Sequence, residues 1–143
     1  MTTTAALTDQ RSVVRRLIEA SARGDADAAR NLVTEDVVGW SPTLRVNSRD
    51  EFIAQFAERT AALSEVEVTV DRIDASRDRV AAEWHMTAKF TGPLELDEIT
   101  IPPNGHRIEL AGATFADLAG ERIRSFHHYF DDAALIEQLL ALS

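Results

Sequence analysis

Two kinds of spacing divide the hydrophobic positions of this chain into a helical first part and a strand-forming second part. Between Leu7 and Arg23, apolar side chains recur every three or four residues, with arginines on the opposite face. Gly24 is expected to end this helix, because glycine tolerates the left-handed conformation found after helices. Asp25 is then expected to cap a second, short helix from Ala26 to about Val33. The chain therefore opens with two helices.

A capping signal predicts a third helix. Ser48 is followed three residues later by Glu51, the arrangement in which a serine and a glutamate bond the free N–H groups of a helix start. The inner side of this helix is predicted to carry Phe52, Ile53, Phe56 and Leu63. A short strand is expected before it, from Val37 to Trp40, ended by Ser41-Pro42.

After Leu63 the pattern changes to strict alternation, which is typical of half-buried strands. Strands are predicted over 65–70, 80–90, 106–118 and 121–130. A further short strand is predicted over 99–101, directly before the turn at 102–105. Ala119-Gly120 joins the last two strands as a hairpin turn, and 132–140 closes the chain as a short helix. Helices segregated from an antiparallel sheet indicate the α+β fold class. We expect one domain over 1–143, with 1–6 disordered.

Composition excludes several classes of protein. The chain has no cysteine, so disulfide scaffolds, thiolate zinc sites and cysteine nucleophiles are excluded. A formal net charge of −9 without a basic stripe argues against nucleic acid as a partner. No window is apolar enough to span a bilayer, and the first residues lack the features of a signal peptide. The chain is therefore expected to be a soluble cytoplasmic protein with no membrane partner.

Three segments, in order, resemble the SnoaL-like polyketide cyclase family of the NTF2-like superfamily. The first is Trp84–Pro93, a strand with an early tryptophan that ends in Thr-Gly-Pro. The second is Ile101–Leu110, in which a proline turn leads into a long strand, and the third is Tyr129-Phe130-Asp131 with the helix after it. The resemblance implies a cone, in which a curved antiparallel sheet is wrapped by the N-terminal helices around an apolar pocket.

The resemblance also implies cofactor-free acid/base chemistry on a small apolar carbonyl compound of polyketide type, by a cyclase or isomerase. The family's catalytic carboxylate at the end of the last strand matches Asp131. A carboxylate in an apolar pocket gains basicity, as removal of an α-proton requires. If Asp131 points into the cone, alternation places His127 and Tyr129 on the same face, where they could hold a substrate carbonyl. The alternative is that Asp131 or Asp132 only caps the last helix, and for Asp132 the cap is the preferred interpretation.

Apolar side chains are the candidates for the pocket wall and for a partner surface. A flat apolar ligand could be bound by Trp40, Phe56, Trp84, Met86 and Phe90. The same alternation in the last strand places Phe126 and Phe130 on the outer side of the sheet. Exposed aromatic residues on a sheet mark a partner surface, and together with the resemblance they predict a homodimer packed sheet to sheet.

The remaining polar residues predict neither a metal nor a cofactor. The four histidines lack metal-ligand spacing, and no Gly-rich phosphate loop or nucleophile elbow is present. Two further functions stay open. A non-catalytic small-molecule-binding module would use the same pocket, and the apolar Trp40 and Phe90 at places where relatives carry polar groups favour it. A limonene-type epoxide hydrolase would need an Asp-Arg-Asp group, for which Arg72, Arg107 and Arg122 are the candidates.

Overall fold

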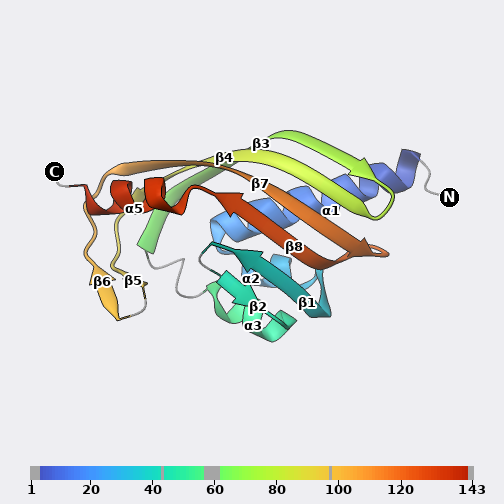
Figure 1. Cartoon of the computed structure of the whole chain (residues 1–143), viewed down its shortest axis with the longest axis horizontal. Coiled ribbons are helices and arrows are strands. Elements are labelled where there is room, and N and C mark those ends of the chain that lie inside the picture. Colours follow the sequence, from blue (N-terminus) through green and yellow to red (C-terminus); the bar gives the residue numbers. More distant parts are fainter. Residues whose placement is uncertain (1–3, 43, 57–61, 97, 142–143) are drawn as a thin grey trace.

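A long helix, α1, lies along one face of the sheet in the computed structural model, which describes residues 4–42, 44–56, 62–96 and 98–141 (Figure 1). It spans Thr4–Arg23 and packs against strands β3 (Leu63–Ser76) and β4 (Arg79–Phe90) through buried side chains such as Val14 and Leu17. Residues 4–6 thus belong to a helix rather than to the predicted disordered segment, while 1–3 lie outside the described residues. Gly24, with φ of +72°, ends the helix as predicted.

Two short helices follow the capping signals of the sequence. In α2 (Ala26–Arg30), the Asp25 carboxylate accepts a hydrogen bond from the Ala28 N–H at 3.1 Å. In α3 (Arg49–Ala54), Ser48 Oγ accepts one from the Glu51 N–H at 3.1 Å. The Glu51 carboxylate accepts a hydrogen bond from Asn47 N at 2.7 Å. In the predicted arrangement it would accept from the N–H of Ser48, so the observed bond lies one residue earlier in the chain.

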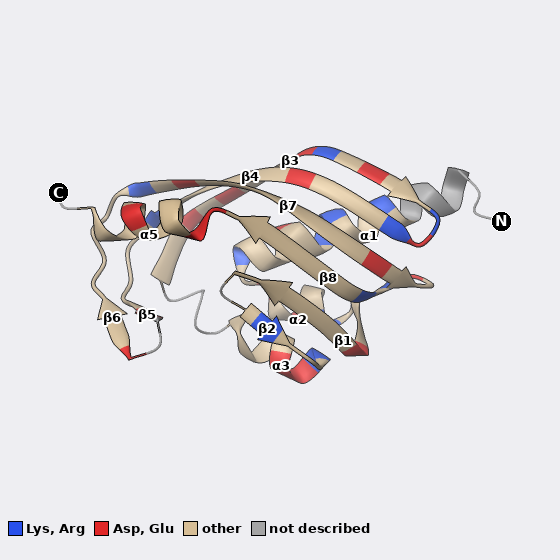
Figure 2. Ribbon diagram, viewed as in Figure 1, with Lys and Arg blue, Asp and Glu red and all other residues tan. Residues whose placement is uncertain are grey.

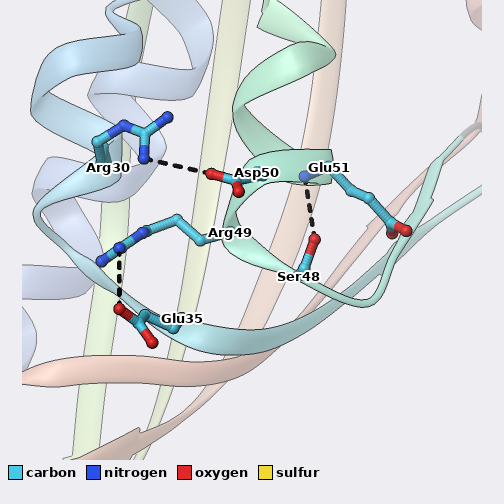
Figure 3. Close-up of polar contacts among 6 residues, drawn as sticks. All are labelled: Arg30, Glu35, Ser48, Arg49, Asp50 and Glu51. Carbon is cyan, nitrogen blue, oxygen red and sulfur yellow. Dashed lines mark hydrogen bonds and ion pairs between the residues drawn. The ribbon is translucent and has the colours of Figure 1, made fainter.

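Ion pairs tie α3 to its neighbours (Figure 3). Arg30 at the end of α2 lies 3.4 Å from the Asp50 carboxylate, and Arg49 lies 3.5 Å from Glu35 on strand β1 (Val33–Ser41). Residue 63, predicted for the inner side of this helix, instead begins a strand, and 57–61 lie outside the described residues. Within the described residues, α3 therefore ends at Ala54, earlier than its apolar pattern indicates.

Six strands form one sheet in the order β2-β1-β8-β7-β4-β3. Their bounds are β1 Val33–Ser41, β2 Leu44–Val46, β3 Leu63–Ser76, β4 Arg79–Phe90, β7 Arg107–Ala119 and β8 Arg122–Phe130. Neighbouring strands run antiparallel except β1 and β8, which are parallel. This pairing brings the first strand of the chain beside the last, and the curved α+β architecture is the predicted one.

A separate two-stranded hairpin and the last helix lie at one end of the sheet (Figure 1). The hairpin consists of β5 (Leu94–Leu96) and β6 (Ile99–Ile101), inserted between β4 and β7. The helix, α5, spans Asp132–Leu140, the predicted range. Of the hairpin, the sequence predicted only the second strand.

The two faces of the sheet differ in burial, and we call the face covered by α1 the inner face. On β4 the even positions from Val80 to Phe90 point inward, as their alternation predicts, while Glu83 and His85 are exposed on the outer face. Ile108, Leu110 and Thr114 continue the inner face on β7. The inner face therefore carries the hydrophobic core together with a few buried polar side chains.

One irregularity reverses the predicted parity of β8. Asp117 of β7 lies opposite Ser125, but Leu118 lies opposite Ile123, so Arg124 is an extra residue on β8. Such a bulge moves every later side chain to the other face. Phe126 is consequently fully buried on the inner face. The predicted outward position of Phe126 and Phe130, and the inward position of His127 and Tyr129, were wrong for this reason.

Candidate functional site

A cavity of about 420 Å³ opens on the inner face between the sheet, the end of α1 and helix α5. Its wall is mainly apolar and draws on β3, β4, β7, β8 and α5. The apolar lining residues include Ile18, Leu44, Val66, Val68, Trp84, Met86, Ile108, Leu110, Phe130, Leu135, Ile136 and Leu139. This volume is within the range of pockets that enclose small organic ligands. This cavity is therefore the candidate for the apolar pocket that the sequence predicted.

The predicted pocket residues divide into three groups. Trp84 and Met86 line the cavity. Phe56 and Phe90 are buried in the hydrophobic core and are not among the lining residues. Trp40 lies on the outer face, with its ring 5.2 Å from that of Tyr129. Trp40 could not have been placed from the sequence, because nothing in one short strand says which of its faces is inner.

Asp131 caps α5, as the alternative interpretation held. Its Oδ1 accepts a hydrogen bond from the Ala134 N–H at 3.1 Å, and the residue is exposed. It is not among the residues that line the cavity. The structure therefore does not place this carboxylate where it could remove a proton from a cavity-bound ligand.

His127 and Tyr129 belong to an aromatic patch on the outer face. We define the outer aromatic patch as Trp40, Phe115, His127 and Tyr129. The Tyr129 ring lies 5.2 Å from Trp40 and 5.8 Å from Phe115, and Tyr129 keeps 48% of its surface exposed. The sheet separates this patch from the cavity, so neither residue can hold a ligand bound there.

The histidine that does line the cavity is His128. It lies on the inner face of β8 directly opposite Thr114 of β7, and it is 8% exposed. The Trp84 indole N–H donates to Thr114 Oγ1 at 2.9 Å, and Thr114 Oγ1 lies 2.7 Å from His128 Nδ1. A buried chain of three polar groups thus includes the imidazole of His128 at the cavity wall.

Further polar side chains also line the cavity. Asp132, in the first turn of α5, is half-buried and lines the cavity beside Leu135 and Ile136. Ser21, Gln55 and Glu95 also contribute to the lining. Sequence reasoning passed over His128 and Asp132, because the period-two pattern assigned His128 to the outer face and Asp132 to a cap. The dipeptide His127-His128 was the available signal, since either parity places one of its two histidines inward.

The pKa shifts that the structure resolves lie on charged pairs away from the cavity wall. The Arg79 guanidinium donates to Asp117 and lowers the pKa of that carboxyl below its usual value, with a smaller contribution from Ser125. The hydrogen bond from Lys89 lowers the pKa of Glu65 in the same way. These pairs bear on stability rather than on the cavity.

The arginines considered for an epoxide hydrolase do not reach the cavity. Arg72 pairs with Asp74 at 2.8 Å on an exposed part of β3, Arg107 bonds Thr87, and Arg122 is exposed. Arg23 is the arginine in the described lining, and it pairs with Glu19. No Asp-Arg-Asp group is therefore found in the described lining of the cavity.

Metal-binding clusters and membrane-spanning helices are both absent from the described residues. These residues contain no group of three or more His, Asp or Glu side chains that could hold a metal ion. Within the same part of the chain, no helix is both long and apolar enough to cross a membrane.

Comparisons with known proteins place the fold in a family. A SnoaL-like polyketide cyclase described from Jannaschia sp. CCS1 superposes with a TM-score of 0.85 at 19% identity, covering 100% of this chain and 99% of that one. A polyketide cyclase described from Xanthomonas campestris pv. campestris gives 0.75 at 24% identity, covering 94% and 98%. An LEH-like epoxide hydrolase from M. tuberculosis gives 0.71 at 19% identity, covering 94% and 91%. At these identities the likeness concerns the fold alone.

No curated protein matches the sequence significantly. The model of one family does match, over residues 11–139, which is nearly the whole chain. The family match and the structural likeness both agree with the resemblance that three segments in the second half of the chain show. This chain belongs to the SnoaL-like polyketide cyclase family, within the NTF2-like fold.

Proposed function

We propose that the cavity carries out cofactor-free proton transfer beside the carbonyl group of a small, largely apolar compound of polyketide type. The family membership favours this class of substrate. The observation that carries the proposal is the position of His128, a buried titratable side chain in the wall of an apolar cavity. Perturbed or enclosed titratable groups in such pockets are the usual candidates for acid/base chemistry.

The proposed roles move from the predicted residues to their neighbours in the chain. His128 takes the part assigned to His127 and Tyr129, and donates a hydrogen bond to the carbonyl oxygen of the substrate. Asp132 takes the part assigned to Asp131, and its carboxylate removes the proton from the adjacent carbon. The electron pair of that C–H bond forms an enolate, whose negative oxygen the His128 N–H stabilises in a site with little water.

The enolate can then react in two ways. Return of the proton from Asp132 to a different carbon gives isomerisation. Attack of the enolate carbon on a second carbonyl of the same molecule closes a ring, and Asp132 returns its proton to the resulting alkoxide. Both outcomes conserve atoms and electrons without an external reductant or oxidant, so the described lining supplies all the groups that the reaction uses.

Exchange of α-protons with deuterated solvent tests this function without knowledge of the natural product. We expect apolar aryl ketones to exchange faster with the protein than without it, and we expect Asp132→Asn and His128→Ala to slow exchange at least 100-fold, as for loss of general-base or oxyanion groups. The matched control is Asp131→Asn, the same change one residue earlier, where asparagine still serves as a helix cap.

The result is unambiguous because the two aspartates are sequence neighbours with different surroundings. Loss of exchange in Asp131→Asn but not in Asp132→Asn, with both proteins folded, would assign the base to Asp131 and overturn the role proposed for Asp132. Unchanged exchange in His128→Ala would remove the histidine from the reaction.

One observation favours a second candidate function, a binding module without chemistry. The carboxylate that matches the family's catalytic residue, Asp131, is exposed and bonded to the backbone of α5. A relative that has lost its base can still use an apolar cavity to carry a ligand. In that case a tightly bound compound is recovered from the protein unchanged, and no ketone exchanges faster than in buffer.

We also propose that two copies pair through the outer face of the sheet, with the outer aromatic patch at the centre. Phe115 and Tyr129 keep 45% and 48% of their surface exposed, and Val38 beside them keeps 48%. The later parts of β1 and β8, from Val37 and Ser125 onward, carry no Lys, Arg, Asp or Glu (Figure 2). An uncharged aromatic face is complementary to a second copy of itself.

A further inference from the structure

We propose that Asn104 is a site of spontaneous deamidation, and that loss of its side-chain amide detaches the end of helix α5 and opens the wall of the cavity. The site is the Asn104-Gly105 pair in the turn before β7. The inference goes beyond the proposed function and does not rest on it, since it concerns how the cavity is closed and not the reaction inside it.

The side chain of Asn104 joins the end of α5 to the turn before β7. Its Nδ2 lies 3.1–3.2 Å from the carbonyl oxygens of Gln138, Leu139 and Ala141. Its Oδ1 accepts a hydrogen bond from the His106 N–H at 2.9 Å. The last carbonyl groups of a helix lack N–H partners within that helix, so a donor placed there stabilises the helix end. The amide therefore holds α5 at its C-terminal end.

The same end of α5 closes the cavity. Leu135, Ile136 and Leu139 of this helix line the cavity. Leu139 is also buried in an apolar cluster with Ile101 and Ile108, the residues on either side of the turn. The amide and this apolar contact thus hold one part of the helix together, and its release exposes the cavity to solvent from this side.

The residue after Asn104 makes the amide reactive. Gly105 has a φ of +70°, which other residues adopt only with strain, so the turn favours glycine at this position. Glycine also has no Cβ to shield its backbone nitrogen from the preceding side chain. Gly105 N can therefore attack Asn104 Cγ. The bond between Cγ and Nδ2 then breaks, and the proton of Gly105 N leaves with this nitrogen as ammonia.

Water completes the reaction and changes the charge of the side chain. It opens the cyclic imide and leaves a carboxylate, either on an aspartate or on its β-linked isomer. In both products the NH2 donor has been replaced by acceptor oxygens. These oxygens face the carbonyl groups of α5, at the end of the helix where the backbone dipole is also negative. The product therefore repels the helix end that the amide held, and detachment becomes permanent.

Attachment of α5 slows the reaction, because both reacting groups are bonded. The Gly105 N–H donates to Phe90 O at 2.8 Å, and the Asn104 amide is bonded through its nitrogen and its oxygen. Attack requires Gly105 N to give up its proton and Asn104 Cγ to give up its nitrogen, so these bonds must break first. Deamidation therefore proceeds from molecules in which α5 has already come loose.

Peptide mapping by mass spectrometry measures the reaction at every asparagine of one protein sample. The chain has three asparagines, and Asn31 and Asn47, which precede leucine and serine, are the internal references. During incubation at mildly alkaline pH, we expect Asn104 to convert faster than both. Conversion of Asn104 no faster than that of the two references would overturn the proposed site.

Gln138→Ala tests whether detachment of α5 controls the rate. The Gln138 side chain makes two bonds to the backbone of Glu109 on β7, and their loss should speed conversion of Asn104 about fivefold by increasing the loose population. Glu137→Ala, an exposed change on the same helix, is the control and should leave the rate unchanged. Equal rates in the wild type and Gln138→Ala would overturn the coupling between attachment and reaction.

Asn104→Asp reproduces one product of the reaction and tests its effect on the helix. Hydrogen exchange followed by mass spectrometry should show the amides of α5 exchanging roughly tenfold faster than in the wild type. Asn47→Asp, the same change at an exposed site, is the matched control and should leave exchange in α5 unchanged. Unchanged exchange of α5 in Asn104→Asp would show that the amide does not hold the helix.

Fluorescence quenching tests whether the cavity opens. Trp84 lines the cavity, and in a Trp40→Phe background it is the one remaining tryptophan. We expect acrylamide to quench Trp84 more strongly when Asn104→Asp is added to this background. Faster exchange of α5 with unchanged quenching would overturn the opening of the cavity. These measurements use neither a ketone nor turnover, so their failure is distinguishable from failure of the proposed reaction.

Discussion

Asp117 is the half-buried carboxylate of an ion pair on the outer face of the sheet. The guanidinium of Arg79 on the neighbouring strand donates to one of its oxygens at 2.9 Å, and Ser125 Oγ donates to the other at 3.0 Å. Both bonds favour the ionised carboxylate and lower the pKa of Asp117, against a smaller opposing effect of burial. The pair links β4, β7 and β8 at one point of the sheet.

The lowered pKa predicts how this pair contributes to stability at different pH values. A carboxyl group with a depressed folded-state pKa stabilises the fold above its unfolded pKa, and this stabilisation is lost as the pH falls through the folded pKa. Asp117→Asn should therefore reduce the unfolding free energy by roughly 0.5 kcal/mol at pH 7, since the Arg79 side chain is exposed and water screens the pair. Urea unfolding of both proteins should show this difference vanishing in strong acid.

Asp36→Asn, an exposed change on β1, is the control and should leave the stability difference near zero at both pH values. A difference between wild type and Asp117→Asn that persists when the carboxyl is protonated would mean that the side chain acts through packing rather than through its charge.

The residue scale is also where prediction from the sequence failed. Alternation predicted the inner face of β4 correctly, because that strand has an unbroken register with β7. On β8, the single extra residue Arg124 reversed the parity, so that His128 rather than His127 and Tyr129 lies on the inner face. The alternation of polar and apolar residues along β8 does not predict such a bulge, because the bulge depends on how β8 pairs with β7.

At the scale of elements, α5 is held against the sheet by two amide side chains. Gln138 Oε1 accepts from Glu109 N at 2.7 Å and its Nε2 donates to Glu109 O at 2.8 Å, beyond the point where β8 stops pairing with β7. Asn104 Nδ2 lies 3.1–3.2 Å from the carbonyl oxygens of Gln138, Leu139 and Ala141 at the helix end. These contacts satisfy backbone groups that would otherwise bond only water.

Since α5 forms one wall of the cavity, loosening this attachment should weaken ligand binding. Gln138→Ala removes the two hydrogen bonds to Glu109, each worth about 1 kcal/mol. It should raise the amide exchange rates of α5 and lower the affinity for an apolar aryl ketone such as 2-acetylnaphthalene about fivefold. Glu137→Ala, an exposed neighbour on the same helix, is the matched control. Equal effects of the two changes would indicate a general loss of helix propensity rather than loss of the attachment.

Elements were predictable where a local physical signal exists. The caps Asp25 and Ser48, the stop at Gly24 and the range of α5 were confirmed, because each depends on bonds within a few residues. The three-residue strands β2 and β5 were not predicted, since they are too short to show alternation and exist through pairing with β1 and β6. The cavity itself arises from contacts between segments far apart in the chain, which no local pattern encodes.

At the scale of the whole molecule, charge and apolar surface are separated. The chain carries a formal net charge of −9, which makes two copies repel each other on average. Among the strands of the sheet, Lys, Arg, Asp and Glu recur along β3 and β4 and toward both ends of β7, while the later parts of β1 and β8 carry none (Figure 2). A contact centred on the outer aromatic patch would bring aromatic surface together and keep most of the charge away from the interface.

Phe115→Asp tests this arrangement, because it places a carboxylate in the patch without touching the inner face. Sedimentation at micromolar concentration should give twice the 15.8 kDa chain mass for the wild type and the single-chain mass for Phe115→Asp, with unchanged circular dichroism. The same substitution at Ile99, which is 67% exposed on the β5–β6 hairpin, should leave the dimer intact. A wild-type monomer would remove the proposed pairing, and dissociation by Ile99→Asp alone would move the interface to the hairpin. A dimer that persists in Phe115→Asp would place the contact away from the patch, since a desolvated carboxylate pair facing its own copy is strongly unfavourable.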